Sequence, residues 1–191
     1  MPIFFDLIEQ VSAILSQIDQ EIEVLQQASG LQCPSGCGKC CENPQVETTP
    51  LEVLPLALEL VKTNKAEYWL EKATKVNYAG VCIFYEPDPL AAGNGRCGVY
   101  TWRPALCRLF GFAAVRNKHE QSELAACKIH KQTMPEVLAN LPIALAPNFS
   151  DFSMQLRNLQ PEQSDLMPIN EAVAIAINKI GFIFDLDSSN F

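Results

Sequence analysis

Four cysteines fall within nine residues of this chain, in the run CPSGCGKCC. Four more follow at wider spacing, so that all eight lie in two segments, 31–46 and 82–131. The eight are Cys33, Cys37, Cys40, Cys41, Cys82, Cys97, Cys107 and Cys127. Thiols this close together form disulfides, bind a metal or carry out redox chemistry, and each use makes a different demand on the fold. No other feature of the chain limits its fold as strongly.

The start of the chain lacks the marks of an export signal. Residues 1–11 have no basic beginning, and Asp6 and Glu9 interrupt their apolar run. No apolar stretch approaches the ~20 residues that a membrane-spanning helix needs. We therefore expect a cytoplasmic protein without a membrane partner. In that compartment persistent disulfides are uncommon, and clustered cysteines more often bind metal or do redox chemistry.

Composition and charge favour a globular protein. Of the 191 residues, 48% are hydrophobic and 19% are charged, which is not the balance of a disordered chain. The net charge of −8 argues against nucleic acid as a partner. The two cysteine-containing segments nevertheless carry eight basic and five acidic side chains. This local positive excess lowers the cost of forming thiolates.

The first thirty residues predict an amphipathic helix. Apolar residues recur at alternating spacings of four and three from Phe4 to Leu25, and Gly30 closes the pattern. We interpret the seam as packing on its own domain. An apolar seam of this length is also compatible with a homodimer through residues 4–25.

Further helices are predicted along the chain. The sequence Thr49-Pro50-Leu51-Glu52 combines an N-cap, a proline at the first helical position and a capping-box glutamate, so a helix should run to about Lys62. The other predicted helices are 65–76 with Asn64 as cap, 120–131 holding Cys127, 135–141, 150–159 with Ser150 as cap, and 169–180, followed by a strand or extended tail at 180–184.

A small β element is predicted in the cysteine-rich part. The runs 81–85 and 96–100 predict a hairpin carrying Cys82 and Cys97, and Pro104 opens a short helix holding Cys107. We therefore predict a mainly α fold with a small α+β element. It is a single domain, 1–191, with an N-terminal helix 1–30, a metal-binding region 31–131 with a Cys-rich loop and a short hairpin, and a helical region 132–191.

The spacing of the cysteines leaves the metal open. Eight thiols fit two four-thiolate sites, or one such site plus four other thiols. Zinc and iron–sulfur clusters both take cysteine ligands. Because neighbouring side chains of an extended backbone point to opposite sides, we expect Cys40 and Cys41 to point apart, and at least one to meet thiols of segment 82–127. We interpret His130 as a surface residue or a neighbour of the site rather than a ligand.

Three runs together, CPSGCGKCC, CIFY and CGVYTWRPALCRLF, resemble the YkgJ-type CxxCxxCC cysteine-cluster family, which is described as a zinc- or iron-chelating domain. The resemblance spans roughly Cys33 to Cys127 and includes the pairs Arg103-Pro104 and Cys107-Arg108. It implies cysteine-bound metal and leaves a reaction open. A flagellin lysine methylase is similar to this family in its cysteine region, which slightly favours an iron–sulfur cluster over Zn²⁺.

The main functional hypothesis is a metal-binding protein with one or two centres, iron–sulfur or zinc, in a structural or redox role, with an unidentified protein partner. The alternatives are an iron–sulfur enzyme of redox or methyl-group chemistry, and a helix-mediated interaction protein with a structural zinc. We expect Arg103 and Arg108 to donate hydrogen bonds to thiolates or offset their charge. We expect Tyr100, Trp102 and Phe110 to pack around the site and exclude water.

Overall fold

A computed structural model describes residues 2–78, 80–91 and 93–188. It is 59% helical and its strands form small two-stranded sheets, so the predicted mainly α fold with a small β element is confirmed. The α-helices are α1 (Pro2–Ser29), α2 (Lys39–Glu42), α3 (Pro50–Lys62), α4 (Ala66–Lys75), α5 (Ala105–Leu109), α6 (Lys128–Thr133), α7 (Pro135–Ala139), α8 (Phe149–Leu159) and α9 (Ile169–Ser188). The strands are β1 (Glu47–Thr48), β2 (Tyr85–Pro87), β3 (Gly95–Cys97), β4 (Ala114–Arg116), β5 (Ser122–Leu124) and β6 (Met167–Pro168), and the 3₁₀ helices are η1 (Tyr100–Trp102), η2 (Ile143–Leu145) and η3 (Pro161–Gln163).

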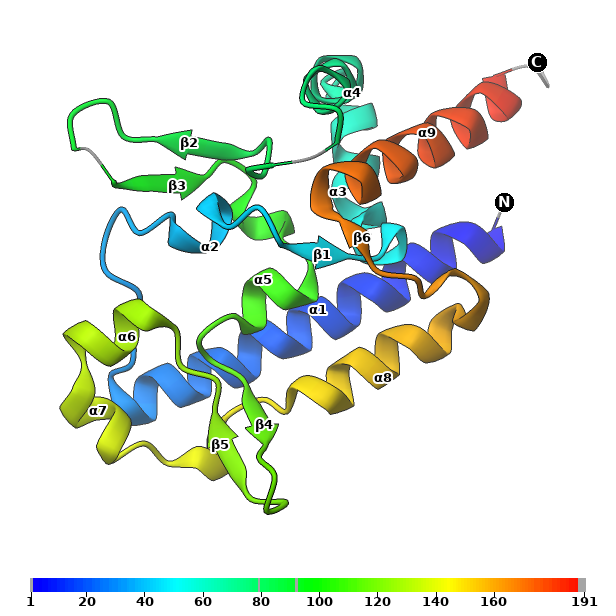
Figure 1. Ribbon diagram of the computed structural model, residues 1–191. Coiled ribbons are helices and arrows are strands. Elements are labelled where there is room, and N and C mark those ends of the chain that lie inside the picture. Colours follow the sequence, from blue (N-terminus) through cyan, green and yellow to red (C-terminus); the bar gives the residue numbers. More distant parts are fainter. Residues whose placement is uncertain (1, 79, 92, 189–191) are drawn as a thin grey trace.

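The long helix α1 runs across the molecule, with α8 beside it and the cysteine-rich elements above its C-terminal half (Figure 1). Its predicted seam is buried from Ile8 to Leu25, because α1 packs on α3, α5 and α8. Gly30 ends the helix with a φ of +74°, which glycine adopts without strain. The chain's own elements therefore cover the seam.

The second packing layer is α9 against α3 and α4 (Figure 1). Thr49 caps α3 as predicted: its Oγ1 accepts a hydrogen bond of 3.3 Å from the Glu52 amide. Pro55 lies inside α3 without ending it. Antiparallel pairing of β1 with β6 brings the starts of α3 and α9 together. Among the described residues, no helix is both long and apolar enough to cross a membrane.

Two predicted elements are wrong. Residues 122–124 form β5, paired antiparallel with β4, and α6 begins only after Cys127. The helical pattern of this stretch was weak, and pairing with β4 satisfies the backbone of β5. Residues 180–184 continue helix α9 instead of forming a strand or tail. Their apolar run is compatible with either structure, and packing on α3 and α4 favours the helix.

Two predicted helix caps are also wrong by one or two positions. The side chain of Asn148, not Ser150, caps α8, because its Oδ1 accepts hydrogen bonds from the amides of Ser150 and Asp151. Lys65 precedes α4 as its N-cap, and Asn64 adopts a left-handed φ of 54° just before it. The predicted helices themselves are confirmed at both places.

Candidate metal centre

The CPSGCGKCC run lies in a loop that docks on the β2–β3 hairpin and ends in α2. The Gly95 amide donates to the carbonyl of Gly36 at 2.9 Å. Gly38 lies against the Tyr85 ring, where a Cβ would clash with that ring and come within 3.0 Å of the Gly95 backbone. The Tyr85 hydroxyl donates to Glu42 at 2.8 Å, which connects α2 to β2. The glycines therefore let the cysteine loop approach the hairpin closely.

The hairpin itself is confirmed but shifted toward its loop. Tyr85 pairs with Cys97, so Cys97 lies in β3 as predicted. Cys82 lies in a turn before β2 rather than in the strand, which corrects the prediction. The Cys82 amide donates to the carbonyl of Cys41 in α2 at 3.3 Å and is therefore not part of the ladder.

Five thiols line one cavity between α2, β3, α5 and the turn before β2. We call them the inner thiol group: Cys40, Cys41, Cys82, Cys97 and Cys107. Apolar side chains of α3 and α9 close the cavity from below, including Val53 and Val173. The cavity has a volume of about 20 Å³, which is room for one ion or one water.

Cys40 and Cys41 do not point apart, so that prediction is wrong. Both lie in α2, where successive side chains rotate by about 100° rather than 180°. The Cys41 thiol hydrogen-bonds to Cys40 and to Cys97, as the prediction of contact with segment 82–127 requires. These bonds lower the pKa of Cys40 to about 6 and that of Cys97 to about 7, and hold the pKa of Cys41 far above its usual range. Cys41 therefore keeps its proton while its two neighbours ionise.

The other two inner thiols are deeply buried. Burial is the main cause that raises the pKa of Cys82 to about 11 and the pKa of Cys107 above its usual range. Neighbouring thiols raise both values further, because thiolates repel one another. A cation bound among these sulfurs would reverse both effects.

Arg103 is the positive group beside the inner thiols, as predicted. Its charge lowers the pKa of Cys40, Cys97 and Cys107. Its guanidinium lies 3.5 Å from the centroid of the Tyr100 ring and donates to the Cys107 carbonyl at 3.3 Å. These contacts hold the guanidinium against α5 and the thiol cavity.

Arg108 is buried, and its contacts lead away from the thiols. It forms an ion pair with Asp19 of α1 and donates to the carbonyl oxygens of Thr101 and of Arg103, the latter at 2.7 Å. Arg108 thus fixes the backbone that carries Arg103 and connects it to α1.

The expected aromatic cover over the site is not present. Tyr100, Trp102 and Phe110 have exposed fractions of 61%, 36% and 42%. They lie in or near the short turns around η1 and α5, which direct them outward. Core residues, among them Phe84, close the cavity instead.

The remaining thiols form a second set, the outer thiol group: Cys33, Cys37 and Cys127, together with His130. The sulfur of Cys33 lies 3.7 Å from Nε2 of His130, and Cys37 and Cys127 are close enough to act on Cys33 electrostatically. Burial, with these two thiols, raises the pKa of Cys33 to about 11. His130 is fully buried, so the interpretation as a surface residue is wrong.

Within residues 2–78, 80–91 and 93–188, no three His, Cys, Asp or Glu side chains already stand as a finished metal shell. The two groups are instead defined by thiols that neighbour one another. Their chemistry fits a thiolate-bound metal, since five thiols share a small apolar cavity beside a guanidinium.

A sequence-family model, CxxCxxCC, described as a "putative zinc- or iron-chelating domain", matches residues 32–128, just over half of the chain. The chain belongs to the CxxCxxCC family. The matched segment contains all eight cysteines, and His130 lies just beyond its end. No curated protein and no solved structure matches the chain.

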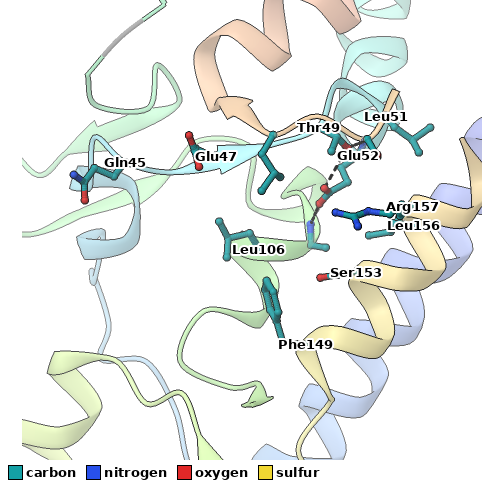
Figure 2. A pocket seen from close by; sticks show the side chains of 13 residues that line it. Gln45, Glu47, Thr49, Leu51, Glu52, Leu106, Phe149, Ser153, Leu156 and Arg157 are labelled. Carbon is teal, nitrogen blue, oxygen red and sulfur yellow. Dashed lines mark hydrogen bonds between the residues drawn. The ribbon is translucent and has the colours of Figure 1, made fainter. Parts of the chain in front are cut away.

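In this CxxCxxCC protein the helix that carries Cys107 is capped by a residue of another helix. Pro104 precedes α5 and offers no side-chain cap, and Glu52 of α3 supplies one: its Oε2 accepts from the Ala105 amide at 2.9 Å (Figure 2). Burial raises the pKa of Glu52. The capping-box pattern identified Glu52 as a cap of its own helix, but its second role depends on how α3 and α5 pack.

The CxxCxxCC protein also has a larger cavity of about 280 Å³, on the side of α5 away from the inner thiols. Glu52, Ser153 and Arg157 lie around it, with Leu106 and Phe149 as apolar walls (Figure 2). None of its lining residues is a cysteine, so it is separate from the inner thiol group.

Proposed function

We propose that this chain is a structural metal-binding protein that holds one zinc ion in the inner thiol group. Cys40, Cys82, Cys97 and Cys107 would supply four thiolates, and Cys41 would keep its proton and donate it to two of them. One observation carries the proposal: five thiols from four separate segments line a single small cavity against the core.

The closeness of the sulfurs supports a single ion. Four sulfurs at about 2.3 Å from a tetrahedral zinc lie about 3.8 Å apart, which is a hydrogen-bonding separation for thiols. Cys41 is in such contact with both Cys40 and Cys97. An iron–sulfur cluster, slightly favoured by the sequence, distributes its cysteines over separate irons and adds inorganic sulfide. A cavity of about 20 Å³ supports the smaller occupant.

The surroundings can offset the charge of such a centre. Four thiolates and a divalent ion carry two net negative charges, and burying them is costly unless they are paired and hydrogen-bonded. Arg103 provides a positive charge next to Cys40, Cys97 and Cys107. The Cys41 thiol supplies a hydrogen bond inside the cavity.

A structural role follows from the shortness of the elements that carry the ligands. Strands β2 and β3 have three residues each, α2 has four and α5 has five. Isolated hairpins and helices of this size are marginal in water. Metal binding contributes directly to folding in small thiolate sites, with about 10–16 kcal/mol apparent for zinc-finger peptides. Zinc would therefore connect these elements to one another and to the core.

The available cavities support this role over redox or methyl-group chemistry. A catalytic metal keeps an open ligand position next to space for a substrate. The cavity with such space has no cysteine in its lining, and the thiol cavity has room for little more than the ion.

Amide hydrogen exchange tests the structural role. Under reducing conditions we expect removal of the metal to abolish protection in α2, β2, β3 and α5, while α1 and α9 retain theirs. Adding zinc should restore it. The control is Cys127→Ser, which leaves the inner thiols in place and should respond to zinc in the same way. Equal protection of these elements with and without metal would contradict the proposal.

A further inference from the structure

His130 has an exposed fraction of 0%, and its two ring nitrogens face different partners. Nδ1 lies 3.2 Å from the carbonyl oxygen of Gly111, and Nε2 lies 3.7 Å from Sγ of Cys33. A carbonyl oxygen only accepts hydrogen bonds, so Nδ1 must carry the proton of the neutral ring. The lone pair of Nε2 is therefore directed at the Cys33 sulfur.

The backbone around His130 is built to hold this orientation. Gly111 has a φ of +84°, and a Cβ there would lie 3.1 Å and 3.2 Å from Cε1 and Nδ1 of His130. The ring of Phe112 packs edge-on against the imidazole, with centroids 5.1 Å apart. Metal-binding histidines commonly have this arrangement, in which the other ring N–H donates to a carbonyl.

Two more thiols neighbour the pair. Cys37 and Cys127 are the nearest thiols that act on Cys33. The sulfur of Cys127 accepts a hydrogen bond from the His130 amide at 3.4 Å. Backbone N–H groups that point at sulfur stabilise negative charge there.

We propose that Cys33, Cys37, Cys127 and His130 form a second metal centre, which binds zinc through three thiolates and Nε2. With ordinary zinc–ligand lengths, a sulfur and a nitrogen of one tetrahedral ion lie about 3.6 Å apart. The separation of 3.7 Å between Cys33 and His130 is close to that value. The ligands come as two chelating pairs, Cys33-x3-Cys37 and Cys127-x2-His130, in the spacing range of structural zinc sites.

This centre shares no ligand with the inner thiol group and does not depend on the function proposed for it. It would join the loop that leaves α1 to the start of α6, which lie side by side in Figure 1. The five-plus-three division of the thiols also explains why a histidine completes the outer set.

Metal stoichiometry of reduced, zinc-loaded variants tests the assignment. We expect the wild-type chain and the exposed-histidine control His119→Ala to bind two equivalents. His130→Ala and Cys127→Ser should bind one, and Cys97→Ser should lose the other. In cobalt-loaded protein, His130→Cys should restore the second equivalent with added thiolate-to-cobalt absorption.

Nitrogen-15 spectra of the histidine side chains give a second readout on the wild-type chain, should His130→Ala fail to fold. We expect zinc to shift Nε2 of His130 while Nδ1 stays protonated, and to leave His119 unchanged. Two equivalents in a folded His130→Ala variant, or an unchanged Nε2 signal, would overturn the outer centre. Loss of only the equivalent that depends on Cys97 would overturn the inner centre instead.

Discussion

The thiol of Cys41, in α2, hydrogen-bonds to the sulfur of Cys97, in β3. If Cys97 is a ligand and Cys41 a donor, their substitutions have different effects. We expect Cys97→Ser to lose the inner zinc, and Cys41→Ala to retain it with an affinity lower by about 10–100-fold, the usual cost of losing such a hydrogen bond. Cys41→Ser keeps a donor and should recover part of the loss. Competition with a chelator measures all three.

The opposite ranking has a clear meaning. Should Cys41→Ala release the inner ion while Cys97→Ser retains it, Cys41 is the ligand and the proton assignment is reversed. Cys127→Ser is the matched control, because it removes a thiol from the outer group only.

Arg103 provides the second prediction. Its positive charge favours the thiolate forms of Cys40, Cys97 and Cys107, which are the forms that bind metal. We expect Arg103→Gln to weaken inner zinc binding by about 10-fold or more. Arg116→Gln, an exposed arginine of β4, should leave it unchanged. Equal affinities for the wild type and Arg103→Gln would remove Arg103 from the site.

Glu52 makes stability depend on pH. Its buried carboxyl has a pKa raised above the unfolded value, so the folded state holds the proton more tightly. That contribution to the free energy of unfolding is complete below about pH 4.5 and is lost as pH rises through the folded pKa. Glu52→Gln cannot titrate. We therefore expect the stability of the wild type relative to Glu52→Gln to fall from pH 5 to pH 8, measured by urea unfolding with zinc present.

The control for this effect is Glu47→Gln, an exposed carboxylate beside the same cavity. Its difference from the wild type should stay constant over that pH range. A constant difference for Glu52→Gln as well would show that Glu52 titrates normally.

The α1 seam provides a fourth prediction. Ile18 is fully buried and Val24 is 51% exposed on the same helix. We expect Ile18→Ala to lower the free energy of unfolding by about 2–5 kcal/mol through cavity formation, and Val24→Ala to have little effect. Light scattering should give the same molar mass for both and for the wild type. A mass that halves in Ile18→Ala without loss of stability would instead indicate a dimer through residues 4–25.

Local signals in the sequence predicted much of this fold. The spacing of apolar residues predicted α1, and Thr49 to Glu52 predicted the start of α3, because both depend on neighbours along the chain. The β5 strand was missed, since it exists through pairing with β4. The direction of α9 beyond residue 180 depends likewise on the helices it packs against.

The site followed the same division. Its residue types and approximate membership were readable, because crowded thiols have few uses in a chain of this composition. The separation into inner and outer groups was not readable, because it depends on α2 forming a helical turn that places Cys40 and Cys41 together. Nor was the place of His130, since Cys33 lies 97 positions away in sequence.

Metal and sulfide analysis of the anaerobically purified protein tests the central claim most directly. We predict a colourless protein with two equivalents of zinc per chain and no acid-labile sulfide. A brown protein with iron and acid-labile sulfide would contradict the zinc assignment, and a metal-free protein with oxidised thiols would contradict both centres.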